Sequence, residues 1–143
     1  MMAANRRLLL FVLAVAVAPL QQAKAQAGHL QGAWLEEGWS CASVFVATLN
    51  GVAFKRPANA FAPAFIVSGK RLSTPLATCR LVGVVPKGER QILRLSCVTA
   101  VTADTARAIF SVASDANVYR YHSVEGGIAT KYLRCTREAL KAP

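Results

Sequence analysis

The feature of this chain that most limits its fold is the regular spacing of short apolar runs after residue 25. Runs rich in Val, Ile, Phe, Leu and Thr alternate with turn residues about every 8 to 12 positions, a spacing typical of antiparallel barrels and sandwiches. Helix signals are nearly absent there, and the candidate strands are 30–35, 41–49, 52–56, 64–68, 77–85, 91–100, 106–113, 118–123 and 128–136. We expect an all-β fold, a small antiparallel up-and-down β-barrel of about eight strands, with a β-sandwich as the alternative.

Turn residues place two hairpins along the chain. Asn50-Gly51 separates the apolar runs 43–49 and 52–55, and Asn-Gly is the strongest short-range signal for a two-residue hairpin turn. A second turn runs through Pro86-Lys87-Gly88-Glu89. We expect the strands that flank each turn to be antiparallel neighbours in the sheet.

Centring the second hairpin on Gly88 gives its two strands a matching pattern. One face is then apolar, with the opposed pairs Cys79 and Cys97, Leu81 and Leu95, and Gly83 and Leu93. The other face carries Arg80, Arg94 and Ser96. Because directly opposed residues share a face of the sheet, the hydrophobic pattern and the turn position predict the same register.

The chain has four cysteines, all after residue 40. In a chain that is exported from the cytoplasm, as the N-terminal pattern described below predicts, an even number of cysteines indicates two disulfides. The hairpin register brings Cys79 and Cys97 within bridging distance, which leaves Cys41 and Cys135 to tie an early strand to the last one. In a barrel the first and last strands are neighbours, so this second pair fits the predicted fold. Since the chain has no Cys-x-x-Cys and no histidine near a cysteine, we expect no metal site.

The first 25 residues have the pattern of a cleavable export signal. Arg6 and Arg7 precede an apolar run over 8–20, and a small-x-small site, Ala23-Lys24-Ala25, follows. That run is shorter than the ~20 residues a membrane helix needs. We expect cleavage near Ala25, a single disulfide-bonded domain over 26–143 and a periplasmic or secreted location.

After cleavage the chain carries 17 − 3 = 14 basic residues against 7 acidic residues. If the strands after residue 77 form a meander, arginines from successive strands share an outer sheet face: Arg80, Arg94, Arg107 and Arg120. Such a basic face attracts anionic partners, and we expect a protein or an anionic envelope component. Export argues against a nucleic acid, and the alternative is charge that serves solubility alone.

Gly32-Ala33-Trp34 opens the first strand of the predicted domain. With the disulfide-stapled all-β pattern, this motif resembles calycin-type barrels, the group of the lipocalins and of small bacterial protease inhibitors. The resemblance implies that Trp34 closes one barrel end beneath a basic residue from the last strand, Arg134 or Arg137. It also implies an N-terminal inhibitory segment in the inhibitors, for which only residues 26–31 are present here.

No catalytic constellation stands out, so we expect no enzyme and no cofactor. The chain has two imidazole bases, His29 and His122, and no Gly-x-Ser-x-Gly motif. Glu36-Glu37 is the one acidic pair, and adjacent strand residues point to opposite sides. A hydrolase would require His122 to meet an acidic residue in a pocket.

The predicted function is therefore that of an exported binding or inhibitor-type protein that acts through its basic face. The alternative is a carrier of a small apolar ligand in the barrel lumen, entered past Phe61 and Phe65. The loop that contains both is expected to pack on the core rather than form a lid. For a domain of this size, side chains are expected to fill the lumen.

Overall fold

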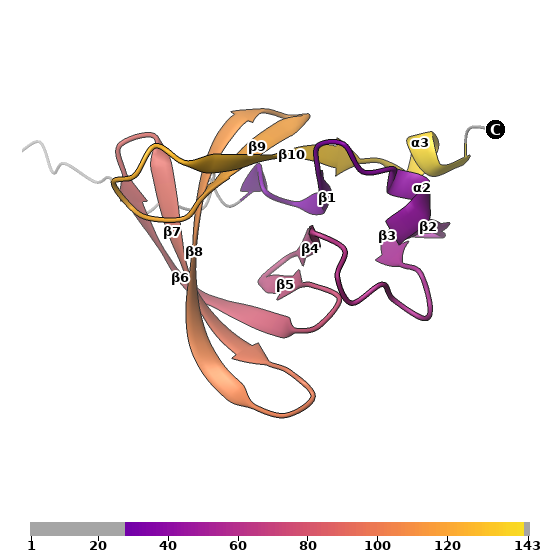
Figure 1. Cartoon of the computed structure of the whole chain (residues 1–143), viewed down its shortest axis with the longest axis horizontal. Coiled ribbons are helices and arrows are strands. Elements are labelled where there is room, and N and C mark those ends of the chain that lie inside the picture. Colours follow the sequence, from indigo (N-terminus) through magenta and orange to yellow (C-terminus); the bar gives the residue numbers. More distant parts are fainter. Residues whose placement is uncertain (1–27, 142–143) are drawn as a thin grey trace, which may run out of the picture.

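The computed structural model describes residues 28–141 and has a closed antiparallel barrel at its centre (Figure 1). The barrel strands are β1 (Gly32–Glu36), β4 (Ala64–Ser68), β5 (Arg71–Ser73), β6 (Thr78–Lys87), β7 (Arg90–Val98), β8 (Ala103–Ser114), β9 (Asn117–Tyr121) and β10 (Ala129–Cys135). From β4 onward each strand pairs with the next one in the chain, and β1 closes the barrel between β4 and β10. The predicted eight-stranded up-and-down barrel is confirmed, and the sandwich alternative is wrong. None of the helices in the described part of the chain is long and apolar enough to span a membrane.

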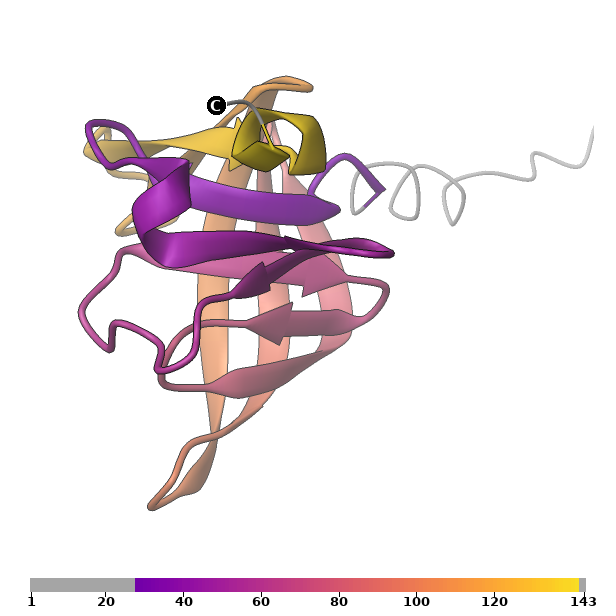
Figure 2. The same ribbon diagram turned by 90° about the vertical axis from the view of Figure 1, so that its right-hand side faces the viewer.

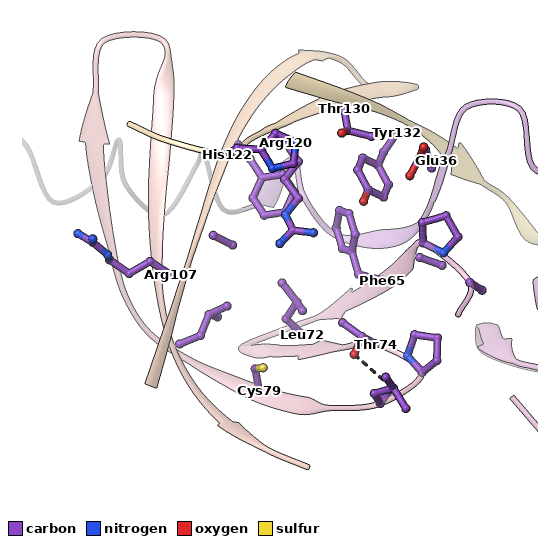
Figure 3. A pocket seen from close by; sticks show the side chains of 18 of the residues that line it. Glu36, Phe65, Leu72, Thr74, Cys79, Arg107, Arg120, His122, Thr130 and Tyr132 are labelled. Atoms are coloured by element: carbon purple, nitrogen blue, oxygen red, sulfur yellow. Dashed lines mark hydrogen bonds between the residues drawn. The ribbon is translucent and has the colours of Figure 1, made fainter. Parts of the chain in front are cut away.

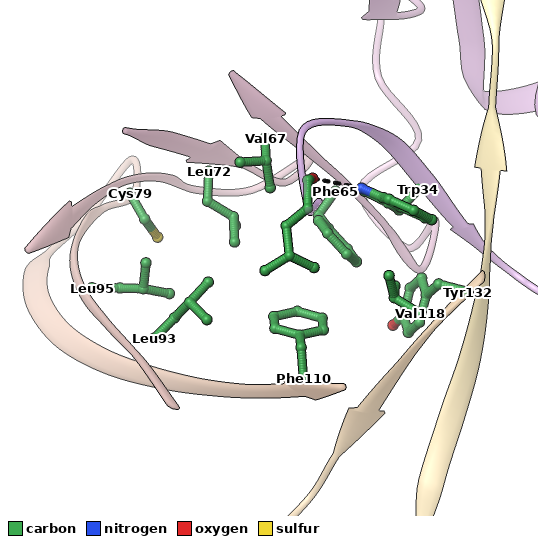
Figure 4. Close-up of a cluster of buried hydrophobic side chains, with 11 residues drawn as sticks. Trp34, Phe65, Val67, Leu72, Cys79, Leu93, Leu95, Phe110, Val118 and Tyr132 are labelled. Atoms are coloured by element: carbon green, nitrogen blue, oxygen red, sulfur yellow. Dashed lines mark hydrogen bonds between the residues drawn. The ribbon is translucent and has the colours of Figure 1, made fainter. Parts of the chain in front are cut away.

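Alternate residues of the barrel strands point inward and form the core (Figure 4). On β7, for example, Leu93 and Leu95 are buried while Arg94 and Ser96 are exposed, as the period of two of a half-buried strand requires. The aromatic rings of Trp34, Phe110 and Tyr132 surround Phe65, with centroid distances of 6.4, 5.1 and 5.2 Å respectively.

A second apolar cluster lies outside the barrel, against the outward side of β1. Ala33 and Leu35 are covered there by a small layer that contains α2 (Cys41–Val44), β2 (Phe45–Thr48), β3 (Gly51–Phe54) and α3 (Arg137–Lys141). Phe45 and Phe54 are opposed in the β2–β3 hairpin, with ring centroids 5.2 Å apart. β1 is therefore buried on both faces, which explains why Ala33, Trp34 and Leu35 are all apolar.

Both disulfides have the predicted pairing. Cys79 and Cys97 lie opposite each other on β6 and β7 with Cα atoms 3.9 Å apart, and Cys41 and Cys135 lie 5.7 Å apart. The second bridge joins α2 to the end of β10, so it fastens the outer layer to the barrel. The expectation that it joins two strands is wrong, although β1 and β10 are neighbours as predicted.

The predicted register of the β6–β7 hairpin is correct near the disulfide and wrong near the turn. Leu81 faces Leu95 as expected, but Gly83 faces Arg94 and not Leu93. A register shift at Val82 places one extra residue in β6, which is how a β-bulge changes pairing. The turn itself consists of Gly88 and Glu89, and Gly88 has the positive φ of 60° that a type II′ turn demands at its first position.

The region from residue 41 to residue 54 also departs from the prediction. The expected strand 41–49 begins with helix α2, and the two-residue turn of the β2–β3 hairpin is Leu49-Asn50, one residue before Asn50-Gly51. Strand β5 and helix α3 are not predicted by the sequence pattern. The export signal predicted over 1–25 lies outside the described residues.

The two ends of the barrel differ. At one end, called here the closed end, the Trp34 indole donates a hydrogen bond of 2.8 Å to the Leu30 carbonyl, and the Arg134 guanidinium carbon lies 4.4 Å from the indole centroid. Arg134, rather than Arg137, donates hydrogen bonds to the carbonyls of Gln31 and Asp115. Figure 2 shows the loops of the opposite end, called the mouth, on its left side.

Candidate functional site

A cavity of about 470 Å³ opens at the mouth of the barrel (Figure 3). Its floor is apolar and is formed by Phe65, Leu72, Leu95 and Phe110, which also belong to the barrel core. The expected filling of the lumen is therefore correct for the half near the closed end and wrong for the half near the mouth. This volume is within the range of about 300–1,000 Å³ of small-molecule sites.

The upper wall of the cavity carries a group of polar side chains from the ends of β1, β9 and β10. They are Glu36, Arg120, His122, Thr130 and Tyr132. Their orientation follows from the register, because Arg120 faces both Thr130 of β10 and the buried Phe110 of β8, and Glu36 faces the buried Tyr132. Opposed residues share a face, so these side chains point into the lumen.

Arg120 is the cation of this cavity. Figure 3 shows its side chain turned into the opening toward Phe65, beside His122. Over residues 28–141, no carboxylate lies within ion-pair distance of its guanidinium, and it donates no hydrogen bond. A guanidinium above an apolar floor can bind a carboxylate or phosphate in bidentate geometry.

Glu36 supplies a negative charge on another part of the same wall. Figure 3 places it beside Tyr132, with Tyr132 and Thr130 between it and Arg120. No ion pair of the described residues includes Glu36. Its neighbour Glu37 points outward and pairs with Lys131 at 2.7 Å; this hydrogen bond and charge raise the pKa of Lys131.

The prediction that Arg120 belongs to the outer basic face is therefore wrong, because its side chain points into the lumen. Arg80, Arg94 and Arg107 do lie exposed on the outer side of β6, β7 and β8. Arg107 borders the cavity, yet Figure 3 shows its side chain directed away from it. Two like-charged pairs stand directly opposite on this outer surface, Arg71 with Arg80 and Arg94 with Arg107.

The loop between the two phenylalanines is divided between core and solvent. Phe65 is buried in the barrel core, but Phe61 is 88% exposed, so the expected core packing is wrong for Phe61. Between them, Ala62 and Ala64 are buried in the outer cluster and also border the cavity.

A hydrolase would require His122 to meet an acidic residue in a pocket, and the structure meets this requirement only in part. His122 and Glu36 border the same cavity, but no ion pair joins them. General base catalysis needs a hydrogen-bonded arrangement of base and nucleophile, and His122 makes no side-chain hydrogen bond in the described range. Nor does that range contain a metal-binding cluster of three or more His, Cys, Asp or Glu residues. That the protein is not an enzyme stays a prediction.

Thr130 and Tyr132 are site residues that the sequence reasoning missed, and Glu36 was considered only as half of the Glu36-Glu37 acidic pair. A signal for part of the wall exists in β9, where Arg120 and His122 alternate with the inward Val118. Comparison with protein-family models finds no match to this chain, and comparisons with curated proteins and with solved structures find none either. What the chain does must therefore be inferred from the cavity itself.

Proposed function

We propose that this protein is an exported binding protein that holds a small amphipathic anion in the mouth cavity. The observation that carries the proposal is the Arg120 guanidinium, without an ion-pair partner over residues 28–141, above an apolar floor in a cavity of about 470 Å³. The apolar part of the ligand would cover Phe65 and Phe110, and its acidic group would accept hydrogen bonds from Arg120.

The polar wall also favours a particular charge on the ligand. One carboxylate gains the charge-assisted hydrogen bonds of Arg120, which are stronger than neutral ones. A second carboxylate placed near Glu36 would meet a like charge in a partly desolvated site. The arrangement therefore favours monoacids with an apolar body over diacids.

Export is part of the same proposal. The pattern of residues 1–25 is that of a secretory signal, and both cysteine pairs are joined as disulfides. Disulfides persist in oxidising compartments such as the periplasm or the extracellular space. A carrier there would keep an apolar acid in solution between membranes or outside the cell.

The test compares two ligands that differ only in the acidic group, decanoate and decanol, by isothermal titration calorimetry. Arg120→Gln should weaken decanoate binding about tenfold, the lower end of the loss expected for a charge-assisted hydrogen bond. Decanol should bind both proteins alike. Arg94→Gln is the matched control, because Arg94 is exposed on the outer face and does not border the cavity.

Two outcomes would contradict the proposal. One is an absence of decanoate binding by the unmodified protein. The other is an equal loss in Arg120→Gln and Arg94→Gln, because a general effect of positive charge would then explain the affinity.

Recognition of a protein or an anionic envelope component by the outer basic face is the second candidate. The observation in its favour is the direct opposition of Arg94 to Arg107 and of Arg71 to Arg80. Like charges directly opposite one another destabilise a sheet, so an anionic partner would relieve this repulsion. Its binding should weaken with salt, because exposed charges are screened.

A further inference from the structure

The loops of the barrel strands at the mouth share a feature that the turns at the other ends of those strands lack. Five connections lie around the mouth, namely 37–40, 55–63, 74–77, 99–102 and 122–128; Figure 2 shows them on its left side, with the 99–102 loop at the bottom. Each contains one exposed large apolar side chain, and these are Trp39, Phe61, Leu76, Val101 and Ile128. The turns at the other ends of the barrel strands are Gly69-Lys70, Gly88-Glu89 and Asp115-Ala116, without a large apolar residue. The β6–β7 turn lies beside the 122–128 loop, because Arg90 donates hydrogen bonds to the carbonyls of Ser123 and Val124.

These five side chains surround the opening without packing on one another as a core would. Val101 is 92% exposed and Phe61 is 88% exposed, and neither borders the cavity. Single exposed apolar residues are ordinary on a protein surface, but one on every loop around one opening is a pattern. Separate apolar tips suit a fluid surface that admits each of them independently, such as the interfacial layer of a bilayer.

The charge around the mouth indicates the kind of bilayer. Lys55 and Arg56 precede Phe61 in the same loop, and Arg107 follows Val101 on β8. None of these three cations has an ion pair in the part of the chain that the structure describes.

Acidic groups at this end are largely neutralised. Glu37 pairs with Lys131 at 2.7 Å, and Glu125 pairs with Lys87 at 3.0 Å. Glu36 points into the cavity, which leaves Asp104 as the acid on the approach to the 99–102 loop. The excess of positive charge complements anionic lipid headgroups.

We propose that the mouth of the barrel docks on an anionic phospholipid bilayer, with the apolar loop tips in the interfacial layer and the nearby cations on the headgroups. Resting on the proposed ligand function, this docking lets an amphipathic acid pass between bilayer and cavity without crossing water. A membrane surface, rather than a protein, is the partner of this end of the barrel.

Flotation with phospholipid vesicles tests the docking. The unmodified protein should float with vesicles of phosphatidylcholine and phosphatidylglycerol, and about tenfold less with phosphatidylcholine alone, since each basic residue near an anionic surface adds to binding. The double variant Phe61→Ser with Val101→Ser should lose most of its binding to the anionic vesicles. Leu49→Ser is the matched control, because Leu49 is equally exposed at 88% but lies in the β2–β3 turn, outside the barrel mouth.

Each result bears on a distinct part of the account. Loss of flotation in the double variant, with decanoate affinity and thermal unfolding unchanged, supports docking through the mouth. Absence of flotation by the unmodified protein, or an equal loss in Leu49→Ser, overturns the docking while leaving the ligand proposal to its own calorimetric test. Sedimentation that shows a dimer dissociated by the double variant also overturns it, because a second copy then covers the mouth.

Discussion

At the scale of single residues, the closed end depends on the contact between Gly32 and Arg134. Gly32 has a φ of 122°, a conformation that residues with a Cβ rarely adopt. A Cβ at this position would lie 2.5 Å from the nearest guanidinium nitrogen of Arg134. Gly32 thus lets Arg134 lie over Trp34 and reach the carbonyls of the N-terminal segment.

Replacing Gly32 with alanine should therefore lower the free energy of unfolding by about 3 kcal/mol, from the strained φ and the displaced guanidinium. Urea unfolding followed by tryptophan fluorescence measures this loss. Gly127→Ala is the control, since a Cβ added at Gly127 would meet no other atom within 4 Å. A change below about 0.5 kcal/mol in Gly32→Ala, the level of an ordinary surface substitution, would show that the contact is not needed.

The sequence identified part of this arrangement and missed the rest for a physical reason. The Gly32-Ala33-Trp34 resemblance pointed to a basic residue over the indole, which Arg134 supplies. Whether the Arg120 side chain points into the lumen or outward depends on the register of β9 against β8, which places Arg120 opposite the inward Phe110. That register includes a shift between Val112 and Ser114, close to the turn. A bulge of this kind changes which residues are opposed, and the amino-acid composition does not reveal it.

At the scale of strands and helices, the two disulfides constrain very different lengths of chain. Cys79 and Cys97 are separated by 18 positions within one hairpin, whereas Cys41 and Cys135 are separated by 94. The entropy that a crosslink removes from the unfolded chain grows with the logarithm of the loop length. The bridge between the outer layer and the barrel should consequently stabilise the protein more.

The double variant Cys79→Ala with Cys97→Ala should lose about 3 kcal/mol of unfolding free energy, and Cys41→Ala with Cys135→Ala about 4.5 kcal/mol. Guanidinium unfolding of each protein at equilibrium gives both values. The reverse order would show that lost packing around Cys79, inside the barrel core, outweighs the effect on the unfolded chain.

The elements that the sequence missed are the short ones. β5 has three residues, too few to show alternation, and α2 has four residues whose apolar character continues directly into β2. An apolar run of this length is compatible with either a strand or a buried helical turn. The long β6–β7 hairpin was placed correctly near its disulfide because periodicity and turn position agree there.

At the scale of the whole molecule, the barrel is filled at one end and hollow at the other. Leu30, Trp34, Val67 and Val118 fill the lumen on the closed side, while the floor of Phe65 and Phe110 opens into the cavity. The closed end is held by the Arg134 contacts, and the mouth carries Arg120 and the apolar loops. This difference between the two ends makes the mouth the candidate binding site.

The most direct test of this account is to map ligand contacts by NMR during titration with decanoate. We predict backbone amide shifts concentrated at the mouth, at residues such as Leu72, Arg120 and Tyr132, which border the cavity. The closed end, including Gln31 and Asp115, should keep its shifts. Shifts spread over the outer face around Arg94 and Arg107, with Leu72 and Tyr132 unmoved, would contradict the account, because the ligand would then bind the basic face and not the cavity.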